Sequence, residues 1–196
     1  MSRRPPFVGL TGGIGAGKSE ALAALARLGA ATLSTDAVVH ALYAEPVVRD
    51  AVVARWGEQV APGGVVDRGA VARRAFASDG ERAWLERLLW PLVAERVARW
   101  REQATGRALV VETPLLFEAG LDERYDATIA IVADEAIRAQ RAGSRGHAAL
   151  DERTARQLSQ QEKAARATYA VENSGSLEAL EQELEGVLVK LLNATE

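Results

Sequence analysis

The stretch "GLTGGIGAGKSEAL", residues 9–22, places a run of glycines between an apolar segment and an amphipathic one. Gly12, four further residues and then Gly17, Lys18 and Ser19 fit the pattern G-x-x-x-x-G-K-[ST]. Glycines let backbone N–H groups turn inward around phosphate oxygens, where a Cβ atom would obstruct. The helix that follows presents its first N–H groups and the positive end of its dipole to the same anion. We therefore predict a loop that holds phosphates.

The polar residues of this loop predict particular contacts. Lys18 can reach the β- and γ-phosphates as a point charge, and the Ser19 hydroxyl can ligate Mg²⁺. The alternative is an ordinary glycine-rich turn with a lysine nearby. However, the chain has only three lysines, at positions 18, 163 and 190, and 21 of its 24 basic residues are arginine. A chain whose basic residues are mostly arginine has a lysine at this position, which favours phosphate binding.

Length and composition limit the class of protein. The chain has 196 residues, 48% of them hydrophobic and 26% charged, which is ordinary for a globular protein with one core. The net charge of −3 does not indicate a nucleic-acid scaffold. Without cysteine there are no disulfides, which fits a reducing cytosol. We find no signal peptide and no apolar run long enough for a membrane span, so we expect a cytoplasmic protein that contacts no membrane.

Strand and helix patterns alternate along most of the chain. We predict strands at residues 6–11, 31–35, 107–112, 127–132 and 169–172, and helices at 18–28, 134–145, 151–167 and 176–193. The apolar runs at 107–112 and 127–132 are typical of parallel strands covered on both faces. The expected fold is therefore α/β, with a parallel five-stranded sheet of the P-loop NTPase type flanked by helices.

A helical stretch at 37–105 interrupts this alternation. It is broken at Pro46, at Gly57 and at the turn 62–64, and it has the character of an insert that binds a substrate. Its longest apolar periodicity contains Pro91, which should kink or split the helix.

Three kinds of protein commonly contain such a loop: switch GTPases, mechanical ATPases and small-molecule kinases. A switch GTPase would usually carry D-x-x-G and N-K-x-D, which are absent, and a motor would need more chain. A small-molecule kinase needs an acid for the acceptor hydroxyl and arginines for the transferring phosphoryl group. Asp36, at the end of the second predicted strand, could be that acid or the N-cap of a helix that begins at Ala37. Arg138, Arg141 and Arg145 share one helical face, which could face phosphate or solvent. These residues predict a P-loop kinase with an unspecified acceptor.

Beyond the loop, residues 8–180 resemble the dephospho-coenzyme A kinase family in consistent order. "LTGGIGAGKS" is similar to that family's P-loop almost letter for letter, and "ETPLLFEAG" resembles its P-L-L-F-E signature. "STDAVVH" resembles its D-A-D-x-x-x-[HR] segment, with Asp36 and His40 on the second acid and the basic position. Ser34 replaces the first acid of that segment.

Further segments extend the resemblance. "DRGAVARRAFAS" is similar to D-R-x-x-L-x-x-x-V-F, "QRAGSR" resembles the Q-x-x-R-x-x-x-R lid, and "RQLSQQEK" resembles R-x-x-x-Q-x-x-K. These matches carry Arg68, Arg141, Arg145, Arg156, Gln160 and Lys163, and the last segment, "ATYAVENSGSLEAL", retains Asn173. The chain departs from the pattern at Trp90, which stands for a histidine, and at Thr168, which stands for an acid.

The resemblance implies transfer of the ATP γ-phosphoryl group to the ribose 3′-hydroxyl of dephospho-coenzyme A, which yields coenzyme A and ADP. It implies a nucleotide-binding core at 1–36, 106–137 and 165–196, an acceptor-binding helical subdomain at 37–105 and a lid at 138–164. No obligate protein partner is evident. A kinase for another small hydroxyl acceptor, such as a nucleotide or a sugar acid, and a nucleotide-binding regulator without turnover remain as alternatives.

The resemblance and the loop together assign roles to individual residues. The expected catalytic residues are Lys18, Asp36, Arg141 and Arg145, and the expected metal ligand is Ser19. The residues expected to bind ATP are Gly13, Gly15, Ala16, Gly17, Lys18, Ser19, Glu20 and Asn173. Those expected to bind the acceptor are Asp36, His40, Arg68, Pro114, Leu115, Leu116, Phe117 and Glu118.

Overall fold

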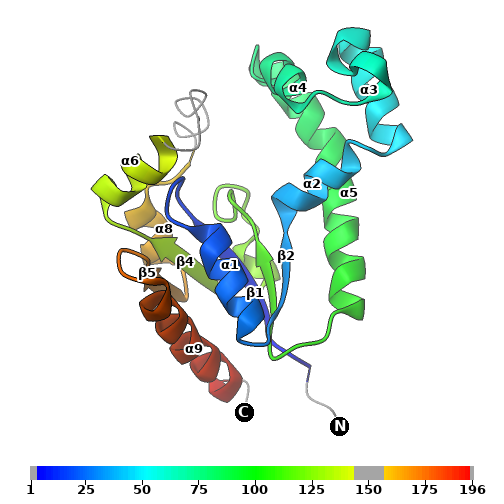
Figure 1. Cartoon of the computed structure of the whole chain (residues 1–196). Helices are drawn as coiled ribbons and strands as arrows, with labels where there is room; N and C mark the ends of the chain where they lie inside the picture. Colours follow the sequence, from blue (N-terminus) through cyan, green and yellow to red (C-terminus); the bar gives the residue numbers. More distant parts are fainter. Residues whose placement is uncertain (1–3, 144–156, 195–196) are drawn as a thin grey trace. The chain divides into compact units, whose positions relative to one another are not determined.

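The computed structural model describes residues 4–143 and 157–194. The chain divides into two compact units (Figure 1). The first unit consists of Met1–Ser34 and Gln103–Glu196, and the second consists of Thr35–Glu102. Each unit has a hydrophobic core of its own.

A five-stranded parallel sheet forms the centre of the first unit. Its strands are β1 (Phe7–Gly12), β2 (Ala31–Ser34), β3 (Leu109–Glu112), β4 (Ala127–Val132) and β5 (Tyr169–Glu172). They pair in the order β2-β3-β1-β4-β5, and every pair is parallel. The predicted sheet is therefore confirmed. Because β1 is the central strand, the glycine loop that follows it lies at the middle of the carboxyl edge, where α/β sheets bind ligands.

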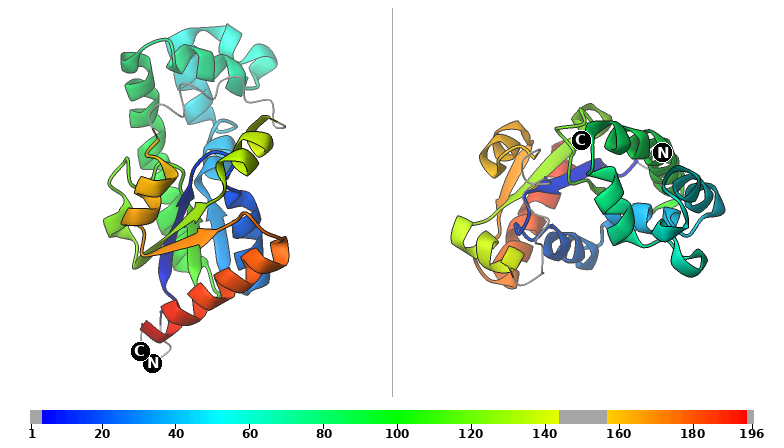
Figure 2. Two further views of the ribbon diagram at one scale, coloured as in Figure 1. Left: turned by 90° about the vertical axis from the view of Figure 1, so that its left-hand side faces the viewer. Right: turned by 90° about the horizontal axis from the view of Figure 1, so that it is seen from above.

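Helices cover both faces of this sheet. The helices of the first unit are α1 (Lys18–Arg27), α6 (Glu135–Gly143), α8 (Gln160–Arg166) and α9 (Leu177–Ala194). Helices α1 and α9 pack together on one face, and α8 covers β4 on the opposite face (Figure 2).

The central strand β1 shows why both faces need cover. Its side chains alternate between the two faces, as the geometry of a strand requires. Val8 and Leu10 are fully buried in the core that α1 and α9 complete. A Cβ atom on Gly9 would lie 2.5 Å from the Leu116 side chain, so the opposite face is packed equally closely at this point.

The second unit is helical, as predicted. It contains α2 (Thr35–Leu42), α3 (Pro46–Trp56), α4 (Arg68–Ala75) and α5 (Asp79–Gln103), with 3-10 turns at Glu58–Val60 and Pro62–Gly64. Its core includes Leu42, Val48, Val52, Trp56, Val60, Val71 and Leu89. The predicted breaks at Pro46 and Gly57 are confirmed, because α3 begins at the first and ends before the second.

Two predicted helix boundaries are wrong. Helix α2 already includes Thr35 and Asp36, so Asp36 is not the cap of a helix that begins at Ala37. It lies in the first turn, where a carboxylate is favoured by the helix dipole. Helix α8 begins at Gln160 because Ser159 forms a capping box with Glu162. These hydrogen bonds from Ser159 lower the pKa of Glu162, and residues 151–156 of the predicted helix lie outside the described residues.

Helix α5 runs through Pro91 without a break, so the predicted split is wrong. A proline at this position cannot donate a hydrogen bond to the carbonyl group of Arg87. Both residues are exposed, so water can satisfy that carbonyl group. The helix therefore tolerates the proline at the cost of one backbone hydrogen bond.

We expect Pro91→Ala to raise the free energy of unfolding by about 1–3 kcal/mol, because alanine restores the hydrogen bond and has a higher helix propensity. Chemical denaturation monitored by circular dichroism would measure this change. Ala94→Ser, at an exposed position of the same helix, is the control and should change stability little. A Pro91→Ala variant less stable than the parent would show that α5 depends on the proline for its packing.

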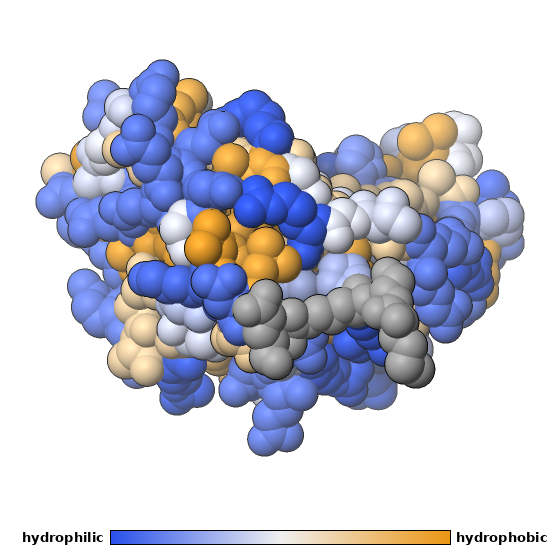
Figure 3. All heavy atoms as spheres, turned by 90° about the horizontal axis from the view of Figure 1, so that it is seen from below, coloured by the Kyte–Doolittle hydropathy of each residue, from blue (hydrophilic) through white to orange (hydrophobic). Residues whose placement is uncertain are grey.

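Few large hydrophobic side chains are exposed. Within the described residues they are Val47, Val65, Trp90, Leu115, Leu177 and Val189. Figure 3 accordingly shows a face on which most residues are hydrophilic, with small groups of hydrophobic residues between them. No helix in the described part of the chain is long and apolar enough to cross a membrane.

Candidate active site

The glycine loop between β1 and α1 requires two residues without side chains. Gly15 and Gly17 have φ angles of 78° and 90°, in the left-handed region that favours glycine. A Cβ atom on Gly15 would lie 2.5 Å from the carbonyl oxygen of Arg138, and one on Gly17 would lie 2.0 Å from Nδ2 of Asn173. The glycine pattern is therefore required by both the backbone angles and the close neighbours of the loop.

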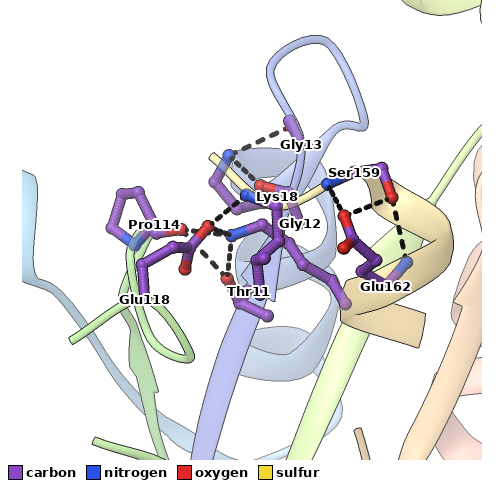
Figure 4. A network of polar contacts seen from close by, with 10 residues as sticks. Thr11, Gly12, Gly13, Lys18, Pro114, Glu118, Ser159 and Glu162 are labelled. Carbon is purple, nitrogen blue, oxygen red and sulfur yellow. Dashed lines mark hydrogen bonds and ion pairs between the residues drawn. The ribbon is translucent and has the colours of Figure 1, made fainter. Parts of the chain in front are cut away.

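Lys18 points back into this loop. Its Nζ donates to the carbonyl oxygens of Gly12 at 3.0 Å and Gly13 at 3.3 Å (Figure 4). Ser19, the next residue of α1, is exposed. A cation at the start of a helix, beside exposed polar groups, suits a polyphosphate because the helix dipole adds to the positive potential there.

Side chains from distant segments brace the loop. Asn173 is buried and its Nδ2 donates to the carbonyl oxygen of Ala16 at 2.8 Å. From α6, Nε of Arg138 donates to the carbonyl oxygen of Ile14 at 3.1 Å, and Nη1 of Arg141 donates to that of Asn173 at 3.0 Å. Arg138 and Asn173 thus bond directly to the loop, and Arg141 bonds to it through Asn173. Arg145 lies outside the described residues.

Glu112, to which the sequence assigned no role, lies next to the end of β1, because it pairs in register with Leu10. Glu112 is the last residue of β3, the strand next to β1, and only 7% of it is exposed. Oγ of Ser34, its register partner on β2, donates to Oε2 of Glu112 at 2.7 Å. The sequence does contain a signal for this residue, because an acid ends the apolar run at 107–112. The ends of parallel strands meet at one edge of the sheet, where ligands bind.

The segment predicted to bind the acceptor is largely buried. Leu116 and Phe117 belong to the core, whereas Leu115 is 37% exposed. Before this segment, the Thr113 hydroxyl lies 3.3 Å from that of Tyr125, and burial raises the pKa of Tyr125 above its ordinary value. Of these three hydrophobic side chains, that of Leu115 is therefore the one that solvent and a ligand can reach.

Two of the other predicted acceptor residues lie together in the second unit. Nη1 of Arg68, the first residue of α4, is 3.5 Å from Nδ1 of His40 on α2. Asp67 caps α4, because its Oδ1 accepts hydrogen bonds from two backbone N–H groups. Both His40 and Arg68 are exposed, as is Asp36 at the start of α2. The predicted acceptor residues of this unit, Asp36, His40 and Arg68, are therefore all accessible to solvent.

The strand order, the loop with its lysine and the helical second unit define a P-loop kinase. The family model for dephospho-CoA kinase matches residues 6–179. The chain belongs to the dephospho-CoA kinase family.

Individual relatives agree with this assignment over nearly their whole length. The dephospho-CoA kinase of Deinococcus radiodurans is 37% identical over 193 residues, which cover 95% of this chain and 93% of the relative. That of Anaeromyxobacter dehalogenans is 38% identical, and the match covers 94% of this chain and 91% of the relative. The crystal structure of TT1252 from Thermus thermophilus has a TM-score of 0.81 at 33% identity, covering 96% of this chain and 99% of that one.

The loop geometry leads to a prediction for Gly17→Ala. A left-handed alanine is strained by roughly 1–2 kcal/mol, and its Cβ atom would also displace Asn173. We therefore expect a lower free energy of unfolding and weaker ATP binding, measured by denaturation and by calorimetry. Gly175→Ala is the matched control, because a Cβ atom there would meet nothing closer than 3.6 Å. If both variants behaved alike, Gly17 would not be needed for the loop conformation.

Proposed function

We propose that this chain transfers the γ-phosphoryl group of ATP to the ribose 3′-hydroxyl of dephospho-coenzyme A, giving coenzyme A and ADP in the last step of coenzyme A biosynthesis. The observation that carries this proposal is the phosphate loop, with Lys18 bonded inside it, in a chain that belongs to this kinase family. We also propose a cytoplasmic location, because the absence of cysteine fits a reducing compartment.

In the proposed reaction, the 3′-oxygen bonds to the γ-phosphorus while the bond from that phosphorus to the β–γ bridging oxygen breaks. Asp36 accepts the proton of the hydroxyl group, as a general base does. Lys18, Arg141 and Arg145 stabilise the charge that develops on the phosphoryl oxygens. Closure of the lid at 138–164 would exclude water, which otherwise competes as an acceptor.

The residues beside the loop suit a bound Mg²⁺. This ion usually takes one or two protein ligands, retains waters and binds substrate phosphates for the rest of its shell. The exposed hydroxyl of Ser19 and the carboxylate of Glu112 are oxygen donors of this kind. When bound, Mg²⁺ neutralises charge on the β- and γ-phosphates. Ser34 would keep Glu112 in position for this role through its hydrogen bond.

Two sets of residues are proposed to bind the acceptor. In the second unit, His40 and Arg68 are exposed basic groups that suit the phosphates of a coenzyme A precursor. In the first unit, Leu115 is a hydrophobic side chain that a ligand can reach. Pro114, Leu116, Phe117 and Glu118 would act mainly by fixing the backbone that carries Leu115.

An acceptor panel tests the proposed function. The purified protein would be incubated with ATP, Mg²⁺ and either dephospho-coenzyme A, nucleoside monophosphates or gluconate, and ADP release would be measured. We expect ADP release when dephospho-coenzyme A is the acceptor and none with the other acceptors. Turnover with another acceptor would identify a different small-molecule kinase, and ATP binding without any turnover would identify a regulator.

Lys18→Ala should lower kcat by roughly 10²–10³, because one contact to the transition-state charge is lost. The melting temperature should change little, since the Lys18 side chain is only partly buried. Lys190→Ala, an exposed lysine on α9, is the control and should keep full activity. Near-parental turnover in a folded Lys18→Ala protein would refute the proposed role of the loop.

Asp36→Asn should lower kcat by roughly 10²–10⁴, because the amide cannot accept the proton. Affinity for ATP should change little, since the loop is intact, and calorimetry would measure it. Asp50→Asn removes an exposed carboxylate elsewhere in the second unit and serves as the control. Retention of more than about half of the parental kcat by Asp36→Asn would exclude Asp36 as the base, since a base contributes far more than a factor of two.

A further inference from the structure

Lys163, on α8, is a lysine with no exposed surface. Its Nζ forms an ion pair with Oε1 of Glu118 at 2.8 Å and donates to the carbonyl oxygen of Pro114 at 2.7 Å. It also lies 3.4 Å from the hydroxyl of Thr11. This ammonium group is thus satisfied within the protein, and none of the proposed reaction steps uses it.

The contacts of Lys163 belong to a network that joins three segments (Figure 4). The Thr11 hydroxyl donates to the carbonyl oxygen of Pro114 at 3.2 Å, which therefore accepts two hydrogen bonds. Oε1 of Glu118 also accepts from the backbone N–H of Leu158 at 2.8 Å. The end of β1, the segment 113–118 and the residues that lead into α8 are connected through these groups.

The position of Thr11 gives the network a link to the phosphate loop. Thr11 immediately precedes Gly12, whose carbonyl oxygen accepts from Lys18. Two lysines therefore bond to consecutive residues, Lys163 to Thr11 on one side and Lys18 to Gly12 on the other. A shift of Pro114 or Thr11 would be transmitted to the loop through one peptide unit.

Stability alone does not account for a buried ion pair. Desolvation of two charges offsets their attraction, and apolar replacements of similar volume are often neutral or stabilising. Oε2 of Glu118 is also buried and has no hydrogen-bond partner among the described residues, which adds to the desolvation penalty. Buried pairs in general add little net stability, yet Lys163 holds the carbonyl group of Pro114 next to Thr11 at the end of β1, which points to a role in geometry.

We propose that Lys163 and Glu118 are positioning residues, which fix the segment 113–118 against the end of β1 so that the proposed acceptor contact and the phosphate loop keep one relative position. This inference rests on the proposed function and refines it. Glu118 acts on Lys163 and on the Leu158 amide rather than on the acceptor. Rigid support of this kind matters for transfer, because a misplacement of about 1 Å can lower a rate by about 10²-fold.

The test compares Lys163→Met, Glu118→Gln and the double variant K163M/E118Q. Lys163→Met alone leaves a buried carboxylate without its counter-charge, so its melting temperature should fall strongly. The double variant removes both charges and keeps an acceptor for the Leu158 amide, so it should regain most of the parental melting temperature. Its kcat should nevertheless stay lower by about 10- to 100-fold, with an unchanged dissociation constant for ATP.

A matched control removes an exposed ion pair from the same unit. Arg27 and Glu181 lie 2.7 Å apart with more than a third of the arginine and a third of the glutamate side chain exposed, so R27M/E181Q should alter neither quantity much. Recovery of both melting temperature and kcat by K163M/E118Q would overturn the proposal and leave the pair a purely structural one.

If the double variant fails to fold, Thr11→Val tests the proposal instead, because it keeps the buried shape and removes only the hydroxyl group. A kcat reduced at parental stability supports the proposal, and an unchanged kcat overturns it.

A second readout separates this proposal from the proposed function. The Thr113 amide donates to the carbonyl oxygen of Leu10 at 2.8 Å, so hydrogen exchange at 113–118 reports how firmly the segment is held without any substrate. We expect faster exchange there in K163M/E118Q than in the parent and in R27M/E181Q. If the parent failed to phosphorylate dephospho-coenzyme A but this difference were seen, the proposed function would fail while the positioning of 113–118 would stand. Parental exchange rates in the double variant would refute the positioning.

Discussion

The hydrogen bonds from the Lys18 ammonium group to the carbonyl oxygens of Gly12 and Gly13 depend on a loop that curls back over the start of α1. That curl needs left-handed backbone angles at Gly15 and Gly17, where a side chain would be strained and would collide with its neighbours. Because β1 is the central strand, groups from both sides of it lie near its end. Arg138 of α6 and Asn173 after β5 donate to carbonyl oxygens of the loop, and Glu112 ends the neighbouring strand β3.

The bracing arginines have an additional consequence for the proposed reaction. In this structure Arg141 donates to the carbonyl oxygen of Asn173, and Arg138 pairs with Glu135 as well as with Ile14. An arginine that meets a transferring phosphoryl group has to give up such bonds or share its five donors between protein and ligand. Exchange of a neutral carbonyl partner for phosphate oxygens is favourable, because the anion adds attraction between opposite charges to the hydrogen bond. In the proposed reaction, the same arginines can therefore first hold the loop and then bind the nucleotide.

Most of the fold could be predicted from sequence, because its signals are local. The apolar runs at 107–112 and 127–132 are long enough to be covered on both faces, and they became β3 and β4. Residues 157–159 were predicted to be helical, but the capping box of Ser159 and Glu162 starts α8 at Gln160. In the candidate site, the loop residues were predictable from a motif. The burial of Lys163 and the place of Glu112 were not, because both depend on which distant segments meet across the sheet.

The insertion of the second unit also affects how the chain can fold. Strands β2 and β3 are neighbours in the sheet, with Ala31 paired to Leu109, yet all of Thr35–Glu102 lies between them in the chain. Pairing across a long unstructured segment has a high loop-closure entropy and slows the assembly of parallel sheets. The inserted unit is helical, has its own core and is built from contacts that are short in sequence, so it can form first. Its early formation would replace a long flexible loop by a compact connector and so raise the rate at which β2 finds β3.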